Sequence, residues 1–352
     1  MRALRFHGRR DLRIEDIPEP QVSDGTVKLK VDWCGICGSD LHEYSAGPIF
    51  IPTEDNPHPI TGEHLPVVMG HELAGTVTEV GAGVDSVAPG DKIAVEPLIY
   101  DGECSACRMG NYNVCEKVGF HGLSGGGGGL AEYTVVPAHM VHKLPDELDT
   151  EVGALVEPIA VGWHAVRQAN FQPGQTALIT GAGPIGAVTL LCLRAAGASW
   201  IAVSEVSHKR KELARELGAD LVIDPRETDV AEAVREHTGG EGVDVALECS
   251  GVTPALDAAV ASVKRHGTVC NVAIWEKPAE LMPNDLIFSE SALTSSLAYA
   301  HDYPAVLANL AKGRIDTSRL ITDEIGLDEV VERGFEELLN NKDEHVKILV
   351  HP

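Results

Sequence analysis

The sequence predicts two domains, an irregular β-rich domain joined to an α/β domain with a doubly wound parallel sheet. The chain has 352 residues, of which 44% are hydrophobic, so it is long and apolar enough for two cores. Residues 1 to 159 contain short β-rich runs separated by Gly and Pro, which is typical of a barrel or sandwich. Residues 160–296 repeat strand, glycine turn and helix, which is typical of a parallel sheet with crossover helices.

The individual elements follow this division. The first part contains the strand-like runs VKLKVDW, ELAGTVTEV, DKIAVEP and AEYTVVP. The second part pairs TALITGAG with the helix PIGAVTLLCLRAAGA, and WIAVSEV with the helix SHKRKELARELGA and the strand LVID. VDVALECSG, a helix that ends near Lys264 and the strand GTVCNVAIW continue the alternation. After residue 297 the pattern is mixed, with the helix DYPAVLANLAKG and the closing strand HVKILVHP.

Charge and cysteine content restrict the partners and the compartment. A formal net charge of −25 would repel phosphate, which argues against nucleic acid or an anionic membrane as a partner. The first residues, MRALRFHGRR, lack the apolar run of a signal peptide, and no segment is apolar for long enough to span a bilayer. Eight cysteines without a secretory signal indicate a reducing compartment, so we expect a cytoplasmic protein.

A dinucleotide site is predicted by GAGPIG, in which Gly181, Gly183 and Gly186 follow a predicted strand and open a predicted helix. The first glycine permits a tight turn, the second lets a pyrophosphate approach the backbone, and the third lets helix and strand pack closely. Pro184 and Ile185 complete the motif where the phosphates would meet the positive end of the helix. Another G-x-G, in VGAGV, has no helix behind it, and we interpret it as a plain turn.

Glu205 supports this site and indicates the cofactor. It ends the next predicted strand, IAVSE, where an acid is expected to bind the two ribose hydroxyls. A carboxylate there would repel a 2′-phosphate, so NAD is favoured over NADP. Arg210, with His208 and Lys209, lies close by and would weaken that preference. The alternative is a strand that ends in an ordinary surface glutamate.

An open catalytic zinc site is predicted from CGICGSDLHEY and VVMGHELAGTV. Catalytic zinc takes about three protein ligands and keeps a position for water or substrate. Cys37 and His71 would supply two ligands. Taken singly, Cys37 would be interpreted as a buried thiol and His71 as a histidine in a turn. The third would be Glu72, beside His71, or Glu157 in LVEPIAVGWHA, which would place the metal in the cleft between the domains.

Ser39 and His42 would provide a proton path from this site. Ser39 is two residues from Cys37, so its hydroxyl could reach an alcohol held by the metal. His42, three residues further on, could pass the proton to solvent through the cofactor ribose. The alternative for each residue alone is a solvated loop position.

A second metal site is indicated by DGECSACRMGNYNVC. Its three cysteines are close enough to hold a metal, but a tetrahedral structural zinc takes four ligands and a fourth cysteine is missing. The three are Cys104, Cys107 and Cys115. The remaining cysteines lie in strand or helix patterns, and we interpret them as small buried hydrophobes: Cys34, Cys192, Cys249 and Cys270.

Taken in order, CGICGSDLHEY, GHELAG, the C-x-x-C-x7-C cluster, VEPIAV and GAGPIG resemble the zinc-dependent medium-chain alcohol dehydrogenase family over essentially the whole chain. GPIFIPTEDNPHPITGEHLPVVMGHE and GFHGLSGGGGGLAEYTVV are most similar to the 2,3-butanediol dehydrogenases of that family. The resemblance implies a GroES-like catalytic domain, residues 1–159 and 297–352, and a Rossmann NAD-binding domain, residues 160–296. It also implies a homodimer or homotetramer.

The resemblance also suggests the missing ligand of the second site. The family's structural zinc usually has four cysteines in the pattern C-x-x-C-x-x-C-x7-C. Cys104, Cys107 and Cys115 match the last three, and Asp101 stands at the first position. A carboxylate oxygen is an accepted zinc ligand, so Asp101 would complete the site. An empty or three-coordinate lobe and three unrelated thiols stay open as alternatives.

The expected reaction is reversible oxidation of a secondary alcohol or vicinal diol to a ketone, with hydride transfer to NAD and zinc as the Lewis acid. The resemblance ranks 2,3-butanediol and acetoin first, polyols such as sorbitol second and L-threonine third. The alternatives are a zinc-free reductase on the same fold and a non-enzymatic NAD-binding protein. The presence of the predicted metal ligands and proton-relay residues disfavours both alternatives, because neither kind of protein would need those residues.

Overall fold

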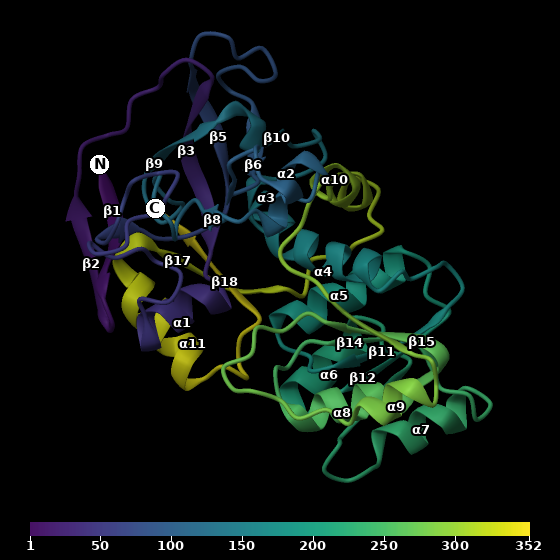
Figure 1. Ribbon diagram of the computed structural model, residues 1–352. Coiled ribbons are helices and arrows are strands. Elements are labelled where there is room, and N and C mark those ends of the chain that lie inside the picture. Colours follow the sequence, from purple (N-terminus) through teal and green to yellow (C-terminus); the bar gives the residue numbers. More distant parts are fainter. The chain divides into compact units, whose positions relative to one another are not determined.

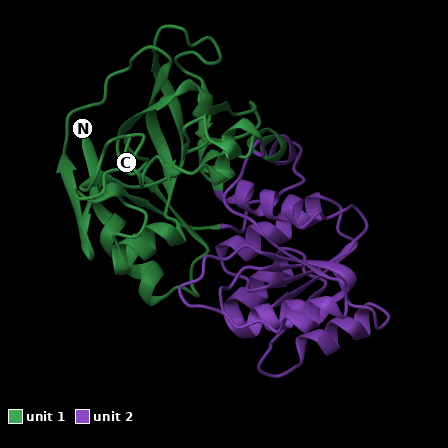
Figure 2. Ribbon diagram, viewed as in Figure 1, with its two compact units in different colours: residues 1–157, 303–307, 321–352 green, residues 158–302, 308–320 purple.

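The computed structural model describes all 352 residues, and they form two compact units (Figures 1 and 2). The first unit comprises Met1–Glu157, Tyr303–Leu307 and Ile321–Pro352, and the second comprises Pro158–Asp302 and Ala308–Leu320. This division differs from the expected boundaries after residue 296, because residues 297–302 and 308–320 group with the second unit. The first unit nevertheless contains both ends of the chain, as expected for a domain that the second interrupts.

The first unit is built mainly from antiparallel strands. A seven-stranded sheet has the order β10-β6-β5-β3-β18-β17, with β9 also paired to β3. Its strands are β3 (Thr26–Gly35), β5 (Glu72–Val80), β6 (Lys92–Val95), β9 (Tyr133–Pro137), β10 (Val141–Lys143), β17 (Ile321–Gly326) and β18 (Lys347–His351). Two smaller sheets contain β1 (Arg2–Gly8), β2 (Asp11–Asp16) and β4 (Val67–Val68), and β7 (Leu98–Ile99) and β8 (Gly119–Phe120).

Short helices complete this unit: α1 (Gly38–Ala46), α2 (Ser105–Arg108), α3 (Thr150–Ala154) and α11 (Glu337–Asn340). Two longer helices, α4 (Val156–Gln168) and α10 (Tyr303–Ala311), have residues in both units. Helix α1 starts directly after β3 because Cys37 has the extended backbone of an N-cap, and the Asp40 carboxylate accepts the Cys37 N–H at 3.0 Å. The segment with Ser39 and His42 is therefore helical, and the alternative of a loop position for each does not hold.

The second unit is a parallel six-stranded sheet with the order β13-β12-β11-β14-β15-β16. This is the strand order of a doubly wound Rossmann sheet, as predicted. The strands are β11 (Thr176–Thr180), β12 (Trp200–Ser204), β13 (Leu221–Ile223), β14 (Val243–Glu248), β15 (Val263–Asn271) and β16 (Ala292–Ser295). The helices are α5 (Pro184–Ala195), α6 (His208–Glu216), α7 (Val230–His237), α8 (Thr253–Ser262) and α9 (Pro283–Ile287). Helix α8 ends two residues before the predicted Lys264.

The sheet order places the glycine motif at a binding position. The chain crosses to the other half of the sheet between β11 and β14, and ligands of doubly wound sheets bind beyond the strand ends at that switch. GAGPIG begins directly after β11, and Glu205 follows the end of neighbouring β12. The other G-x-G, in VGAGV, forms a turn after β5, as predicted.

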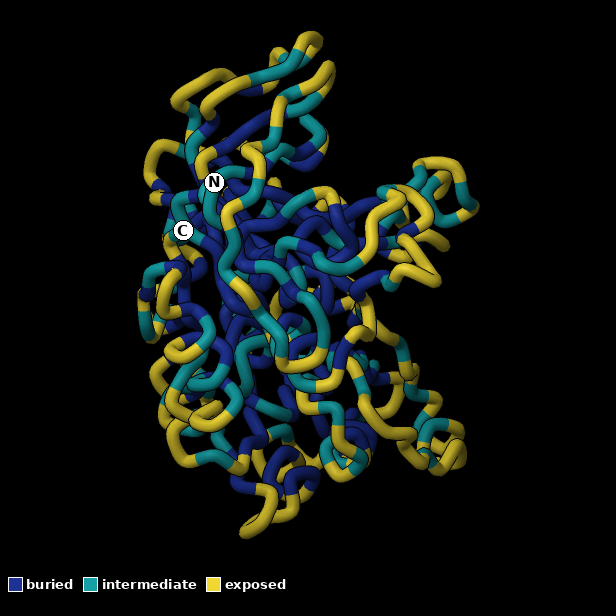
Figure 3. The backbone as a smooth tube through the Cα atoms, turned by 90° about the vertical axis from the view of Figure 1, so that its left-hand side faces the viewer, coloured by how far each residue is buried: buried dark blue, intermediate teal, exposed yellow.

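Each unit has its own apolar core, and Figure 3 shows buried residues in dark blue. In the first unit the core gathers around β3 and β5, with Leu29, Leu73 and Ile348 fully buried. In the second unit Leu178, Ala246 and Val269 on adjacent strands pack against helices α7 and α8. No helix in the structure combines the length and apolar character needed to cross a bilayer.

Candidate active site and metal centres

The first unit carries the predicted catalytic metal ligands at three places in the chain, and of these it brings the Cys37 thiol and the His71 ring into contact. Cys37 is the N-cap of α1, His71 directly precedes β5, Glu72 is the first residue of that strand, and Glu157 lies in the first turn of α4. His71, Glu72 and Glu157 are at most 5% exposed, whereas Cys37 is partly exposed. The Cys37 thiol lies within hydrogen-bonding reach of the His71 ring.

The His71 ring is oriented by groups on both of its nitrogens. Nδ1 faces Asp40 Oδ1 at 3.5 Å, and these two buried atoms make no shorter hydrogen bond to another group. Nε2 lies 3.2 Å from the Ser39 hydroxyl. A carboxylate behind Nδ1 is the usual arrangement for a metal-binding histidine, because it orients the ring and presents Nε2 to the ion. Sequence reasoning missed Asp40, whose place in the first turn of a helix reads as ordinary capping.

Glu72 differs from the other candidates because a cation already holds it. Lys347 Nζ, on β18, lies 2.6 Å from each oxygen of the Glu72 carboxylate and 3.1 Å from the carbonyl oxygen of Ile36. Burial lowers the pKa of Lys347, but the charges of Glu72, Cys37 and Glu157 and the hydrogen bond to Glu72 together outweigh it, and the net shift is upward. The Lys347 side chain is therefore charged at neutral pH. Nothing in the local sequence HVKILVHP indicated this contact.

The donor set of this site fits zinc. A thiol, an imidazole and a carboxylate are the three kinds of side chain that bind catalytic zinc, and a carboxylate already stands behind the imidazole. Ser39 and His42 are three residues apart on α1, so they lie on the same face of that helix. The predicted relay residues are thus attached to the element that carries Cys37.

The second unit carries a glycine turn with the shape that a dinucleotide requires. Gly181 has φ +92°, and a Cβ there would approach Ser250 Cβ to 2.8 Å. A Cβ on Gly186 would overlap the carbonyl oxygen of Gly181, so helix and turn could not pack. At Gly183, in contrast, a Cβ would meet only the Arg210 guanidinium, at 3.7 Å. The middle glycine therefore faces open space beside a cation, where a pyrophosphate fits.

The start of α5 completes this turn. Gly183 is its N-cap, and Pro184 and Ile185 follow as its first residues, so the free N–H groups of the first turn point toward the same space. The Glu205 carboxylate is buried at the end of β12 and accepts the Ala182 N–H at 2.7 Å. It therefore adjoins the glycine turn, as its predicted contact with a ribose requires.

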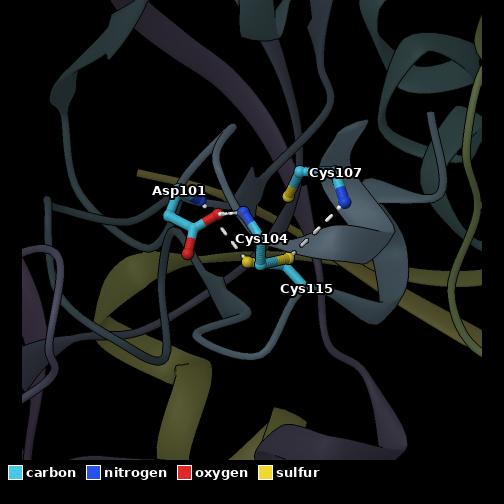
Figure 4. Close-up of side chains that lie close together, drawn as sticks. All are labelled: Asp101, Cys104, Cys107 and Cys115. Carbon is cyan, nitrogen blue, oxygen red and sulfur yellow. Dashed lines mark hydrogen bonds between the residues drawn. The ribbon is translucent and has the colours of Figure 1, made fainter. Parts of the chain in front are cut away.

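The four donors of the second metal site lie in one lobe (Figure 4). The Asp101 carboxylate and the thiols of Cys104, Cys107 and Cys115 have donor atoms all within 4.8 Å of one another. Zinc–sulfur bonds of about 2.3 Å place tetrahedral sulfur ligands roughly 3.8 Å apart, so a small contraction would enclose an ion. This lobe is the group of four predicted ligands that the structure assembles most tightly.

Backbone hydrogen bonds fix the lobe in this form. Asp101 Oδ1 accepts the N–H groups of Glu103 at 2.9 Å and Cys104 at 3.0 Å, and these bonds lower the pKa of the carboxyl. The sulfur of Cys104 accepts the Cys107 N–H at 3.5 Å, and that of Cys115 accepts the Asp101 N–H at 3.4 Å. An ionised carboxylate and sulfur atoms that accept N–H bonds are the arrangement expected around a bound cation. Of the other cysteines, Cys34, Cys192 and Cys270 are buried and Cys249 is half-buried.

Comparison with known proteins identifies the family. The model of the alcohol dehydrogenase GroES-like domain matches residues 23–146, and that of the zinc-binding dehydrogenase matches residues 184–312. The chain is 47% identical to an (R,R)-butanediol dehydrogenase of Bacillus subtilis, over all of both chains. It is 43% identical to one of Neisseria gonorrhoeae, over the whole of this chain and 99% of the relative.

A solved structure agrees with these relatives. The crystal structure of a 2R,3R-butanediol dehydrogenase from Bacillus subtilis superposes with a TM-score of 0.94 at 47% identity, and the match covers 100% of this chain and 99% of that one. The GroES-like and Rossmann assignments are thereby confirmed. The chain belongs to the zinc-dependent medium-chain alcohol dehydrogenase family of oxidoreductases.

Proposed function

We propose that the protein oxidises (R,R)-2,3-butanediol to acetoin, reversibly, with NAD as the hydride acceptor. The observation that supports the chemistry is the Ser39 hydroxyl at 3.2 Å from His71 Nε2, because a proton acceptor would then lie beside a metal bound to His71. The diol is inferred from the activity for which the relatives described above are named. Sorbitol and other polyols are the second candidate substrates, and L-threonine is the third.

For the catalytic metal we propose zinc held by Cys37, His71 and Glu157. Glu72 is the weaker candidate for the third ligand, because both of its oxygens contact Lys347 Nζ at 2.6 Å. When bound, zinc would stabilise negative charge on the substrate oxygen, and NAD would accept the hydride. We propose a further, structural zinc in the lobe of Asp101, Cys104, Cys107 and Cys115.

The proton leaves along helix α1. Ser39 accepts the proton of the substrate hydroxyl as it gives up its own hydroxyl proton toward His42, one turn further on the same face, and His42 releases a proton to solvent. Asp40 keeps the His71 ring in place during this transfer through the Nδ1 contact. The chain thus supplies both the acceptor and the next carrier from a single helix.

The cofactor is NAD in preference to NADP. The buried Glu205 carboxylate adjoins the glycine turn, and its charge would repel a 2′-phosphate. Arg210 lies beside Gly183, where its guanidinium would serve the pyrophosphate, so it is engaged away from the ribose.

We further propose that the protein is a homo-oligomer that assembles through the edge of the Rossmann sheet. Strand β16 is an edge strand, Leu293 on it is 42% exposed, and Ile287 and Phe288, which precede it in the chain, are 63% and 75% exposed. An apolar edge strand is a ready site for pairing with a second copy. Light scattering of Phe288→Asp should show a smaller species than the wild type, and an unchanged mass would contradict this interface.

We propose the cytoplasm as the compartment of the protein. The thiols of Cys104, Cys107 and Cys115 must stay reduced to bind a metal, and the cytoplasm is a reducing compartment.

The decisive experiment is NADH formation on a panel of the three butanediol stereoisomers, sorbitol, L-threonine and ethanol, each with NAD and NADP. We expect the highest kcat/KM with the (R,R) isomer and NAD. A preference for sorbitol or threonine would overturn the diol and keep the zinc chemistry. Cys37→Ser should abolish turnover, and full activity in that variant would overturn the zinc mechanism.

A further inference from the structure

The guanidinium of Arg226 is held in a fixed orientation just beyond the end of strand β13. Its Nε donates to Asp224 Oδ1 at 2.9 Å, and its Nη2 donates to Asp224 Oδ2 at 2.6 Å and to the carbonyl oxygen of Val206 at 2.7 Å. These contacts take up the hydrogen of Nε and both hydrogens of Nη2. Because the group is planar, three contacts along one edge fix the direction in which its two faces point.

Neutralising Asp224 does not by itself account for Arg226. The Asp224 carboxylate is 8% exposed, and Lys211 Nζ, on α6, already donates to it at 2.5 Å. The Lys211 side chain is 14% exposed, whereas the Arg226 side chain is 63% exposed. The buried carboxylate thus has a buried cation as its partner, and the arginine adds a second cation that presents most of its surface to solvent.

This exposed guanidinium lies next to the acid that is proposed to bind the ribose. Val206 follows Glu205 in the chain, donates its backbone N–H to Glu205 Oε1 at 2.7 Å, and accepts the bond from Arg226 with its carbonyl oxygen. Strands β12 and β13 are neighbours in the parallel sheet, so both residues lie at its carboxyl edge. The first half of a dinucleotide binds at this edge, with its ribose on the acid after the second strand.

We propose that Arg226 is the platform on which the adenine base of the dinucleotide stacks. This inference rests on the proposed NAD-linked function and deepens it by naming a residue that recognises the base. A fixed planar cation attracts the face of an aromatic ring, and the side chain of Val206, which is 47% exposed, adds an apolar surface beside it. A phosphate would instead need the donor edge of the guanidinium, which Asp224 and Val206 occupy.

The test measures by calorimetry how AMP and NADH bind to Arg226→Ala and Arg226→Lys. We expect Arg226→Ala to weaken the binding of both ligands about 3- to 30-fold, which is the range for a cation stacked on an aromatic ring. Arg226→Lys should not recover the affinity, because an ammonium keeps the charge but has no planar face. Reduced nicotinamide mononucleotide, which lacks the adenosine half, should bind to both variants as it binds to the wild type.

Arg235→Ala is the matched control. Arg235 is an exposed arginine on α7, and its Nη2 also donates to a backbone carbonyl, that of Ala261, at 2.6 Å. Ala261 lies near the end of α8, directly before β15 begins, so this contact is at the opposite edge of the sheet. The control should keep the wild-type affinity for AMP and for NADH.

Three results would overturn the stacking and leave the proposed function intact, provided that the wild type binds NADH. The first is an unchanged affinity for AMP in Arg226→Ala. The second is wild-type affinity in Arg226→Lys, which would show that charge alone is sufficient; this variant keeps a cation beside Asp224 and therefore serves even if Arg226→Ala does not fold. The third is an equal loss for nicotinamide mononucleotide, which would indicate a general disturbance of the site. A wild type that does not bind NADH would refute the proposed cofactor and this inference together.

Discussion

Glu205 Oε2 accepts a hydrogen bond from the backbone N–H of Ala182 across 2.7 Å, which ties the end of β12 to the glycine turn. Its other oxygen accepts the N–H groups of Val206 and Ser207 at 2.7 and 2.8 Å. A carboxylate has about four acceptor positions, so three backbone bonds leave roughly one for a ligand hydroxyl. The acid proposed to select the cofactor therefore also holds the turn that would bind its phosphates.

The first prediction concerns Glu205→Gln. The amide keeps one oxygen acceptor but loses the charge, and hydrogen bonds to a charged group contribute roughly 1.5–3 kcal/mol. We expect kcat/KM with NAD to fall about 10- to 100-fold, and kcat/KM with NADP to stay level or rise because the repulsion is gone. Steady-state kinetics with both cofactors measure the ratio of kcat/KM with NAD to kcat/KM with NADP.

Glu212→Gln is the matched control for this substitution. Its side chain is 57% exposed on α6, so it removes the same charge from the same unit without touching the turn. The control should leave the ratio of kcat/KM with NAD to kcat/KM with NADP unchanged. If Glu205→Gln also leaves it unchanged, the carboxylate does not select the cofactor and its role is confined to the backbone.

The second prediction concerns Asp101 and the metal content. We expect two zinc ions per chain in the wild type, one in Asp101→Ala, and two in Asp101→Cys, because the thiolate restores a full set of four ligands. Asp101→Ala should also unfold at a lower temperature, since a structural ion contributes its binding energy to folding. Metal analysis and thermal unfolding measure the two effects.

Glu103→Ala provides the comparison, because Glu103 is an exposed acid two residues away that contributes its backbone N–H to Asp101 rather than its side chain. It should keep two zinc ions. A wild type with one zinc per chain, or Asp101→Ala with two, would show that Asp101 is not a ligand.

The parts of the site that the sequence predicted are those encoded within short stretches. The glycine turn needs a positive φ at Gly181 and room at Gly183, and both follow from residue type in a strand–turn–helix context. The lobe places four donors within 15 residues, so their meeting needed no knowledge of the tertiary fold. Local spacing was sufficient in both cases.

The parts that the sequence left open depend on distant contacts. Lys347 reaches Glu72 across 275 positions, and HVKILVHP reads only as a closing strand. Asp40 faces His71 from the first turn of α1, and nothing in the segment CGICGSDLHEY indicates that contact. The positions of Glu72 and Glu157 in the chain do not indicate which of them contacts Lys347, and the structure shows that contact only for Glu72.

The third prediction concerns the proton path. Ser39→Ala should lower kcat by about 10² or more, because general acid–base groups contribute roughly 10²–10⁴ in rate. Zinc content and the KM for NAD should not change, since the Ser39 hydroxyl is not among the proposed ligands. Ser45→Ala, on the same helix with its hydroxyl turned to the His42 carbonyl at 3.4 Å, should keep full activity. Equal rates in both variants would exclude Ser39 from the path.

The last prediction concerns His121, a buried side chain whose Nε2 lies 2.8 Å from the Thr134 hydroxyl. Burial lowers its pKa to about 4, whereas an unfolded chain has a histidine pKa near 6.5. Between these values the unfolded state takes up a proton that the folded state does not. Stability from this residue is therefore complete above about pH 6.5 and declines as the pH falls toward 4.

Each pH unit in that interval costs about 1.4 kcal/mol, so lowering the pH from 7 to 5 should cost about 2 kcal/mol through His121. Urea unfolding at both values measures it. His121→Gln should reduce the difference between pH 7 and pH 5 by that amount, whatever its effect at pH 7, because glutamine does not titrate. His208→Gln, which removes a histidine that is 80% exposed, should leave the difference as in the wild type. Equal pH differences in His121→Gln and the wild type would mean that folding does not lower the pKa of His121.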